Sequence, residues 1–120
     1  MRIVNPTALL GENLATKYLQ NKGYVIIERN FRQRYGEIDI IAISKNTLVF
    51  IEVKTRKSLV YGTPLESITP KKLRDIIKTA QYYALTNDKL PKQLRIDAIS
   101  VLLNKHNNID TIEHVENRSI

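Results

Sequence analysis

Two neighbouring segments, residues 35–44 and 47–56, are rich in apolar residues and are separated only by Lys45-Asn46. Asn tolerates positive φ, so this pair favours a two-residue hairpin turn that places Ser44 opposite Thr47. Side chains alternate between the two faces of a strand, and here both faces are apolar, which is typical of strands buried inside a sheet. One face is predicted to carry Ile38, Ile40, Ala42, Val49, Ile51 and Val53, and the other Ile41, Ile43, Leu48 and Phe50.

Two helices are predicted from their start signals. Asn5-Pro6 and Thr69-Pro70 each combine a capping side chain with Pro at the first helical position. The first helix is expected to run to about Lys22 and to stop at Gly23. The order αβββαββ predicts an α/β fold, a single domain over residues 1–120 with one mixed sheet flanked by helices. The remaining strands are predicted from their β-branched residues at 24–30, 93–103 and 109–115.

The composition narrows the class of protein. The chain has 19 Lys and Arg against 12 Asp and Glu, a formal charge of +7, which favours an anionic partner such as nucleic acid. The alternative is that the charge only keeps the protein soluble. Without cysteine, the chain has no disulfide and no cysteine-ligated metal site. No apolar run approaches the roughly 18 residues of a membrane span, and no secretory signal is evident, so a cytoplasmic protein without membrane contact is expected.

Four charged residues occupy one end of the predicted hairpin. The expected register places Asp39 opposite Glu52 and Glu37 opposite Lys54, all on one face. Two facing carboxylates repel each other, and a hard divalent cation such as Mg²⁺ or Mn²⁺ between them would remove the repulsion. Lys54 would then contact a phosphate or orient a water molecule. The alternative is a purely structural cluster of ion pairs, for example Glu37–Lys54 with Asp39–Arg56.

The same residues resemble a known family. Gly36-Glu37-Ile38-Asp39, followed after the hairpin by Glu52-Val53-Lys54, resembles the PD-(D/E)XK nuclease superfamily. Seven blocks along the chain together resemble the YraN-like family, small bacterial proteins thought to be endonucleases of that superfamily. The blocks are Gly11-Glu12, Asn30-Phe31-Arg32, Gly36 to Asp39, Phe50 to Arg56, Tyr61-Gly62, Ile68 to Lys72 and Arg95-Ile96-Asp97.

The resemblance implies a restriction-endonuclease-like fold and a set of roles. Asp39 and Glu52 would be the metal ligands, with Val53 part of the same metal site. Lys54 would be the catalytic lysine. Ile38 stands where the superfamily name has Pro, a departure that leaves the pattern intact.

Two further glutamates are candidates for the catalytic site. Glu37 directly precedes the Ile38-Asp39 pair. Glu12 matches the first-helix glutamate that archaeal Holliday-junction resolvases add to this site, and its neighbours on the helix suggest that it points toward the sheet. The alternative for Glu12 is a solvated acid of the first helical turn, stabilised by the helix dipole.

Basic residues surround the predicted site and are candidates for contact with nucleic acid. Lys71 and Lys72 open the second helix, where cations oppose the helix dipole but where phosphate would meet free N–H groups. A solvated basic face is the simpler alternative. The loop from Ser58 to Ser67, with Tyr61, would gate the site or stack a base, or is an ordinary connection. The candidate nucleic-acid-binding residues are Arg32, Arg34, Arg56, Lys71, Lys72 and Arg74.

Three residues near the C-terminus receive structural interpretations. Arg95 and Asp97 share a strand face and are expected to form an ion pair, and His114 is expected at the surface.

The leading hypothesis is a Mg²⁺- or Mn²⁺-dependent endonuclease that hydrolyses DNA, with branched or processed structures among the candidate substrates. The second is a nuclease fold that binds nucleic acid or a protein partner without turnover. The third is a structural interaction protein without a nucleic-acid role. A homodimer would suit a cut in both strands, although no sequence feature demands one.

Overall fold

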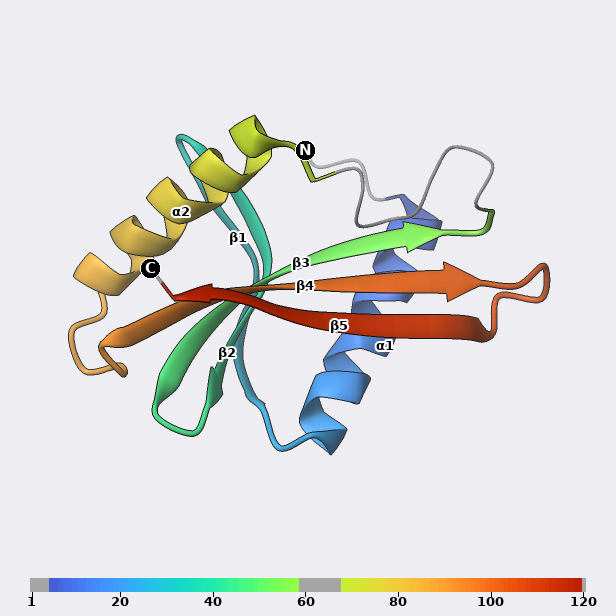
Figure 1. Ribbon diagram of the computed structural model, residues 1–120, viewed down its shortest axis with the longest axis horizontal. Coiled ribbons are helices and arrows are strands. Elements are labelled where there is room, and N and C mark those ends of the chain that lie inside the picture. The colour runs from blue at the N-terminus through green and yellow to red at the C-terminus, as the bar shows by residue number, and fades with distance from the viewer. Residues whose placement is uncertain (1–4, 59–67, 120) are drawn as a thin grey trace.

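The structure is a computed structural model that describes residues 5–58 and 68–119 (Figure 1). Its mixed five-stranded sheet has the order β1-β2-β3-β4-β5, in which β3 and β4 are parallel and the other neighbours are antiparallel. The predicted α/β class and the order αβββαββ are therefore confirmed. The elements are α1 (Pro6–Asn21), β1 (Val25–Gln33), β2 (Gly36–Ser44), β3 (Thr47–Arg56), α2 (Pro70–Leu85), β4 (Gln93–Leu103) and β5 (Ile109–Ser119).

Both helices begin at the predicted signals, and α1 ends at Asn21, close to the predicted stop at Gly23. The Asn5 side chain accepts hydrogen bonds from two main-chain N–H groups in the first turn of α1, and the Thr69 side chain does the same for one in α2. The chain leaves α1 through Gly23, which has a φ of 91°. Glycine adopts this conformation without the steric strain that a side chain would cause. No helix within residues 5–58 and 68–119 is long and apolar enough to span a membrane.

The hairpin of β2 and β3 has the predicted register from Ser44–Thr47 to Ile40–Ile51. Its turn differs in one detail, because Lys45 and not Asn46 adopts the positive φ, at 55°. The prediction relied on the tolerance of Asn for this region. The twist of the strands instead requires the positive φ at the first residue of the loop, whatever its side chain.

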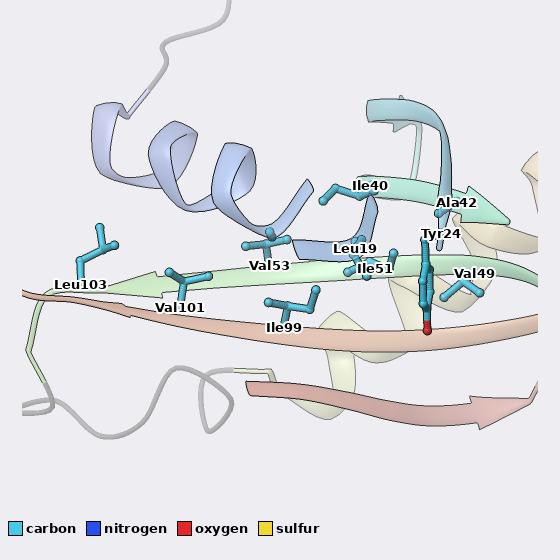
Figure 2. Close-up of a cluster of buried hydrophobic side chains, with 11 residues drawn as sticks. Leu19, Tyr24, Ile40, Ala42, Val49, Ile51, Val53, Ile99, Val101 and Leu103 are labelled. Atoms are coloured by element: carbon cyan, nitrogen blue, oxygen red, sulfur yellow. The ribbon is translucent and has the colours of Figure 1, made fainter. Parts of the chain in front are cut away.

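The two faces of the sheet carry separate apolar clusters. Alternate residues of β3 divide between them, since Val49 and Ile51 lie in one cluster and Leu48 and Phe50 in the other. The first cluster packs under α1, which passes behind the sheet in Figure 1, and Figure 2 shows its side chains between the helix and the strands. The second packs against α2. The hairpin is thus buried on both sides, as its composition predicted.

One assignment to these faces was wrong. Ile38 lies in the α2 cluster, although Ile40, two residues further along β2, lies in the α1 cluster. The regular alternation breaks at Asp39, opposite Asn30 of β1, which has a positive φ of 56°. Asn enters this region more readily than most residues. The backbone therefore turns where the sequence places the first candidate metal ligand.

A buried polar cluster connects β4 and β5. Arg95 donates two hydrogen bonds to the Asp97 carboxylate, at 2.8 and 3.0 Å, which confirms the predicted ion pair. His114 was wrongly expected at the surface, because its side chain is 2% exposed. Its Nε2 lies 2.7 Å from the Oδ2 atom of Asp97, which also accepts a hydrogen bond from Arg95. Burial raises the pKa of Asp97, but the hydrogen bonds from His114 and Arg95 outweigh it and hold that pKa below its ordinary value.

Helix α1 packs closely against β3 at Gly11. A Cβ atom added at Gly11 would lie 1.8 Å from the Oγ1 atom of Thr55, so only glycine allows this approach. Thr55 directly follows Lys54, and Gly11 therefore fixes the helix against the strand that carries two of the candidate catalytic residues.

We predict that Gly11→Ala destabilises the protein. Overpacking against Thr55 should lower the free energy of unfolding by about 1–3 kcal/mol, more than the gain of up to about 1 kcal/mol in helix propensity. Urea unfolding followed by circular dichroism would measure the change. Asn13→Ala, on the exposed side of the same helix, is the control and should be neutral or stabilising. Equal stability of Gly11→Ala and wild type would contradict the close contact.

We also predict that Asp97→Asn lowers the free energy of unfolding at pH 7 by about 3–5 kcal/mol, because it breaks a buried ion pair. Since the folded-state pKa of Asp97 lies below its ordinary 3.8, its stabilisation is present above that pH and is lost as the pH falls further. In thermal unfolding, the difference in Tm between the two proteins should be largest at neutral pH and should begin to shrink as the pH falls below about 3.8. The exposed Asp110→Asn should match wild type throughout.

Candidate functional site

The candidate site lies where β2 and β3 separate. Their ladder ends at Ile40–Ile51, so Asp39 and Glu52 are not a ladder pair as the register predicted. The Asp39 carboxylate instead accepts a hydrogen bond from the Val53 N–H at 2.8 Å. A side-chain oxygen thus replaces main-chain pairing at this point and holds Asp39 against β3.

Glu52 is the buried carboxylate of the site. It lies on the α2 side of β3, as Phe50 does, and is 5% exposed. Its Oε2 atom accepts no hydrogen bond from the described residues, and the Lys72 Nζ lies 3.7 Å away. Burial, followed by the charge of Asp39 and a hydrogen bond with it, raises the pKa of Glu52 to about 8. The two carboxylates therefore face each other as predicted, although by a different backbone geometry.

Lys54 lies two residues beyond Glu52 and shares its face of β3. It is half-buried, and its positive charge, after that of Lys72, acts to lower the pKa of Glu52. Two lysines from different elements therefore act on one carboxylate, which retains a raised pKa in spite of both. A cluster of satisfied ion pairs would lower that pKa, so the purely structural alternative fits this site poorly.

Two other residues of the charged cluster make contacts that the structural alternative did not name. Glu37 pairs across β1 and β2 with Arg32, with 3.1 Å between Oε2 and Nε. Arg56 donates a hydrogen bond to the Thr55 carbonyl oxygen at 3.0 Å. Glu37 is thus on the β1 side of β2, at the margin of the site.

Glu12 points into the molecule and is 8% exposed. It lies in the second turn of α1, so the alternative of a solvated acid in the first turn is wrong. Its Oε1 atom is 3.6 Å from Nη2 of Arg29, which pairs with Ile40 beside Asp39. Glu12 therefore approaches the Asp39 segment from the α1 side of the sheet, whereas Glu52 faces α2.

The donor set suits a cation that retains water. Among residues 5–58 and 68–119, no group of three or more His, Cys, Asp or Glu side chains lies close enough to form a closed metal site. Asp39 and Glu52 supply two carboxylates, and Mg²⁺ in proteins is commonly held by one or two carboxylates together with water and substrate phosphate. The Glu52 oxygen without a hydrogen bond is the position that a cation would satisfy. The residues present therefore fit a hard divalent ion.

Basic side chains extend from this site along α2. Lys72 points to Glu52, while Lys71 pairs with Asp75 at 2.9 Å and Arg74 is exposed. Arg32 and Arg34 are exposed at the end of the β1–β2 hairpin. These candidate basic residues thus lie on α2 and at the end of the β1–β2 hairpin. The interpretation of Tyr61 falls in residues 59–67, outside those the structure describes.

Comparison with known proteins identifies the family. The model of the uncharacterised protein family UPF0102 matches residues 11–101. A UPF0102 protein of Persephonella marina is 51% identical over 107 residues, which cover 89% of this chain and 87% of the relative. The UPF0102 proteins of two Clostridium botulinum strains, Hall and Loch Maree, are 49% and 48% identical over 108 residues, covering 89% of this chain and 88% of each relative.

The chain belongs to the UPF0102 family. This confirms the YraN-like assignment that the sequence motifs predicted. The matched range includes Glu12, Asp39, Glu52 and Lys54. The names of these UPF0102 relatives state the family alone, so the activity has to be argued from the site itself.

We predict that Glu52 makes this UPF0102 protein less stable as the pH rises. Between the ordinary pKa of 4.5 and the folded-state pKa of about 8, the unfolded chain has released a proton that the folded chain keeps. Stability therefore falls across this window. Glu52→Gln removes the titration and should raise the Tm at pH 8 without metal by about 4 °C or more.

Differential scanning fluorimetry from pH 4.5 to pH 8.5 in EDTA would measure this effect. Glu113→Gln, an exposed carboxylate on β5, is the control and should follow the wild-type curve. Parallel curves for Glu52→Gln and wild type would show that Glu52 is not held in a carboxylate pair.

Proposed function

We propose that this UPF0102 protein is a Mg²⁺- or Mn²⁺-dependent endonuclease that hydrolyses phosphodiester bonds in DNA. The observation that carries the proposal is the buried Glu52 carboxylate, which lies beside Asp39 and has an oxygen without a hydrogen bond. Perturbed carboxylates next to a lysine are typical of functional sites. The resemblance to the PD-(D/E)XK superfamily assigns the same three residues, and it does so independently of the geometry.

Two carboxylates are the proposed metal ligands. Asp39 and Glu52 would hold the divalent ion, with the main chain of Val53 beside them. Such an ion supplies Lewis acidity and lowers the pKa of a bound water. The Asp39 hydrogen bond with the Val53 N–H fixes one ligand before metal binds, which limits the reorganisation that binding requires.

Lys54 acts on the substrate in this proposal. Its ammonium group shares the Glu52 face of β3, so a phosphate bound at the metal site would lie within reach of its charge. There it would stabilise the negative charge that develops on the phosphate and orient the attacking water. Lys72, at the start of α2, would hold a neighbouring phosphate through its ammonium group.

DNA is proposed as the substrate on electrostatic grounds. The formal charge of +7 favours a polyanion, and exposed Arg and Lys residues lie on α2 and on the β1–β2 hairpin next to the site. A binding module without turnover is the second candidate function. It is favoured only by the small donor set, two carboxylates without a third acidic or histidine ligand among the described residues.

We predict that Asp39→Ala and Glu52→Ala each abolish metal-dependent DNA cleavage and weaken Mn²⁺ binding. Lys54→Ala should lower the cleavage rate by about 100-fold or more and leave most of the Mn²⁺ binding intact, because it stabilises the transition state and does not hold the metal. The measurements are cleavage of single-stranded, duplex, flapped and four-way-junction DNA with Mg²⁺ or Mn²⁺, and calorimetric titration with Mn²⁺.

Glu113→Gln serves again as the matched acidic control, with full activity expected. Cleavage that survives Asp39→Ala would show that the nuclease activity belongs elsewhere or to a contaminant. DNA binding without cleavage, equal in wild type and Glu52→Ala, would favour the binding module instead.

A further inference from the structure

An exposed aromatic ring lies close to two cations at the end of the β1–β2 hairpin. Tyr35 is 53% exposed. The Arg34 guanidinium carbon lies 5.9 Å from the ring centroid, and the Lys78 Nζ of α2 lies 5.2 Å from it. Exposed aromatic rings beside basic groups are the elements with which proteins bind single-stranded nucleic acid.

The hairpin that carries Tyr35 is held in place by packing. A Cβ atom added at the next residue, Gly36, would lie 3.5 Å from the Thr79 Oγ1 and 3.6 Å from the Asp75 Cβ, so the turn rests directly on α2. The ion pair between Arg32 and Glu37 joins the two strands of the hairpin just behind the turn. The ring is therefore presented on a supported turn, with little conformational entropy left to lose on binding.

The charge around the ring favours an anion. Lys71, Arg74 and Lys78 act together on Asp75, and their combined charge lowers its pKa, chiefly through the hydrogen bond from Lys71. One carboxylate thus faces three cations of α2. Arg34 adds a fourth at the hairpin. A polyanion with flat apolar bases satisfies both the charge and the ring.

The position of Tyr35 relates it to the candidate active site. Lys72 on the first turn of α2 reaches Glu52, and Lys78 on the same helix reaches Tyr35. Six residues of helix separate the two lysines, a rise of about 9 Å along the axis. The exposed ring and the candidate active site are therefore connected by one helix.

We infer that Tyr35, with Arg34 and Lys78, stacks an unpaired base of a DNA strand that enters the candidate active site. The substrate is then DNA with a single-stranded segment near the cut, because the bases of an intact duplex present no free face to a protein ring. The inference rests on the proposed nuclease function for the cut, but the base-binding site is separable from it.

The experiment measures binding and cleavage separately. Binding of a fluorescent oligo-dT strand of about 15 nucleotides, and of a blunt duplex of equal length, is followed by anisotropy in EDTA. Tyr35→Ala should weaken binding of the single strand by about 5- to 100-fold and that of the duplex by less than about twofold. Tyr35→Phe keeps the ring and should bind as wild type does.

Tyr82→Ala is the matched control, an exposed tyrosine further along α2. It should leave the single-strand affinity unchanged. Lys78→Gln should weaken binding of both DNA forms. It should also reduce the slope of the logarithm of the binding constant against the logarithm of the salt concentration by about one. Equal losses for Tyr35→Ala on single strand and duplex, or equal losses for Tyr35→Ala and Tyr82→Ala, would overturn the inference.

Cleavage then separates the two proposals. If Tyr35→Ala slows the cutting of flapped DNA but not of blunt duplex, both proposals are supported. Metal-dependent cleavage of all substrates that is indifferent to Tyr35→Ala would preserve the nuclease and overturn the base-binding site. Ring-dependent binding of the single strand without any cleavage would preserve the base-binding site and overturn the nuclease.

Discussion

The hydrogen bond from the Val53 N–H to the Asp39 carboxylate is the interaction on which the rest of the site depends. It forms where the ladder of β2 and β3 ends, so a side chain satisfies a main-chain donor that would otherwise lose its partner in the sheet. Because it anchors Asp39 to β3, it also brings this carboxylate to Glu52, which β3 carries at the preceding position. Main-chain pairing of β2 and β3 stops at Ile40–Ile51, and the two acids contact each other directly beyond that point. The opening in the sheet and the carboxylate pair are therefore one feature.

This feature is costly to the fold, and its surroundings compensate. Burial and the neighbouring Asp39 carboxylate raise the pKa of Glu52 to about 8. The charged form of Glu52 is therefore disfavoured in the folded protein. The flanking structure is correspondingly tight, with Gly11 of α1 placed against Thr55 directly beyond the site. On the next strand, the Asp97 carboxylate is also buried but has full hydrogen-bond partners in Arg95 and His114. The contrast is informative: the fold satisfies one buried acid completely and leaves an oxygen of the other without a hydrogen bond. Such selective strain is typical of functional sites.

The sequence predicted the features that depend on local chemistry. Cap-plus-proline pairs located both helix starts, and the apolar pattern of residues 40–51 set the hairpin register. The errors concern side chains whose direction depends on distant packing. Ile38 changed faces because the alternation of β2 breaks between Ile38 and Ile40, which a strict two-residue period does not anticipate. His114 is buried because α1 and Tyr24 cover β5, a tertiary contact without a local signal. Tyr35 was missed for a similar reason: the cation above it comes from α2, more than forty residues further along the chain.

Helix α2 connects the two ends of the proposed DNA path, and its own charge pattern is unfavourable without a ligand. Lysines at a helix N-terminus oppose the helix dipole, and α2 begins with two. Each lies near a carboxylate, Lys71 near Asp75 and Lys72 near Glu52. These carboxylates reduce the unfavourable interaction of the two lysines with the helix dipole. Asp75 is part of the same helix and does not compete with the site. Glu52, however, is a proposed metal ligand. A cation held there would replace Lys72 as the neutralising charge and leave that lysine to a phosphate. On this argument metal binding and DNA binding favour each other through one residue, with Lys72 as the group that both share.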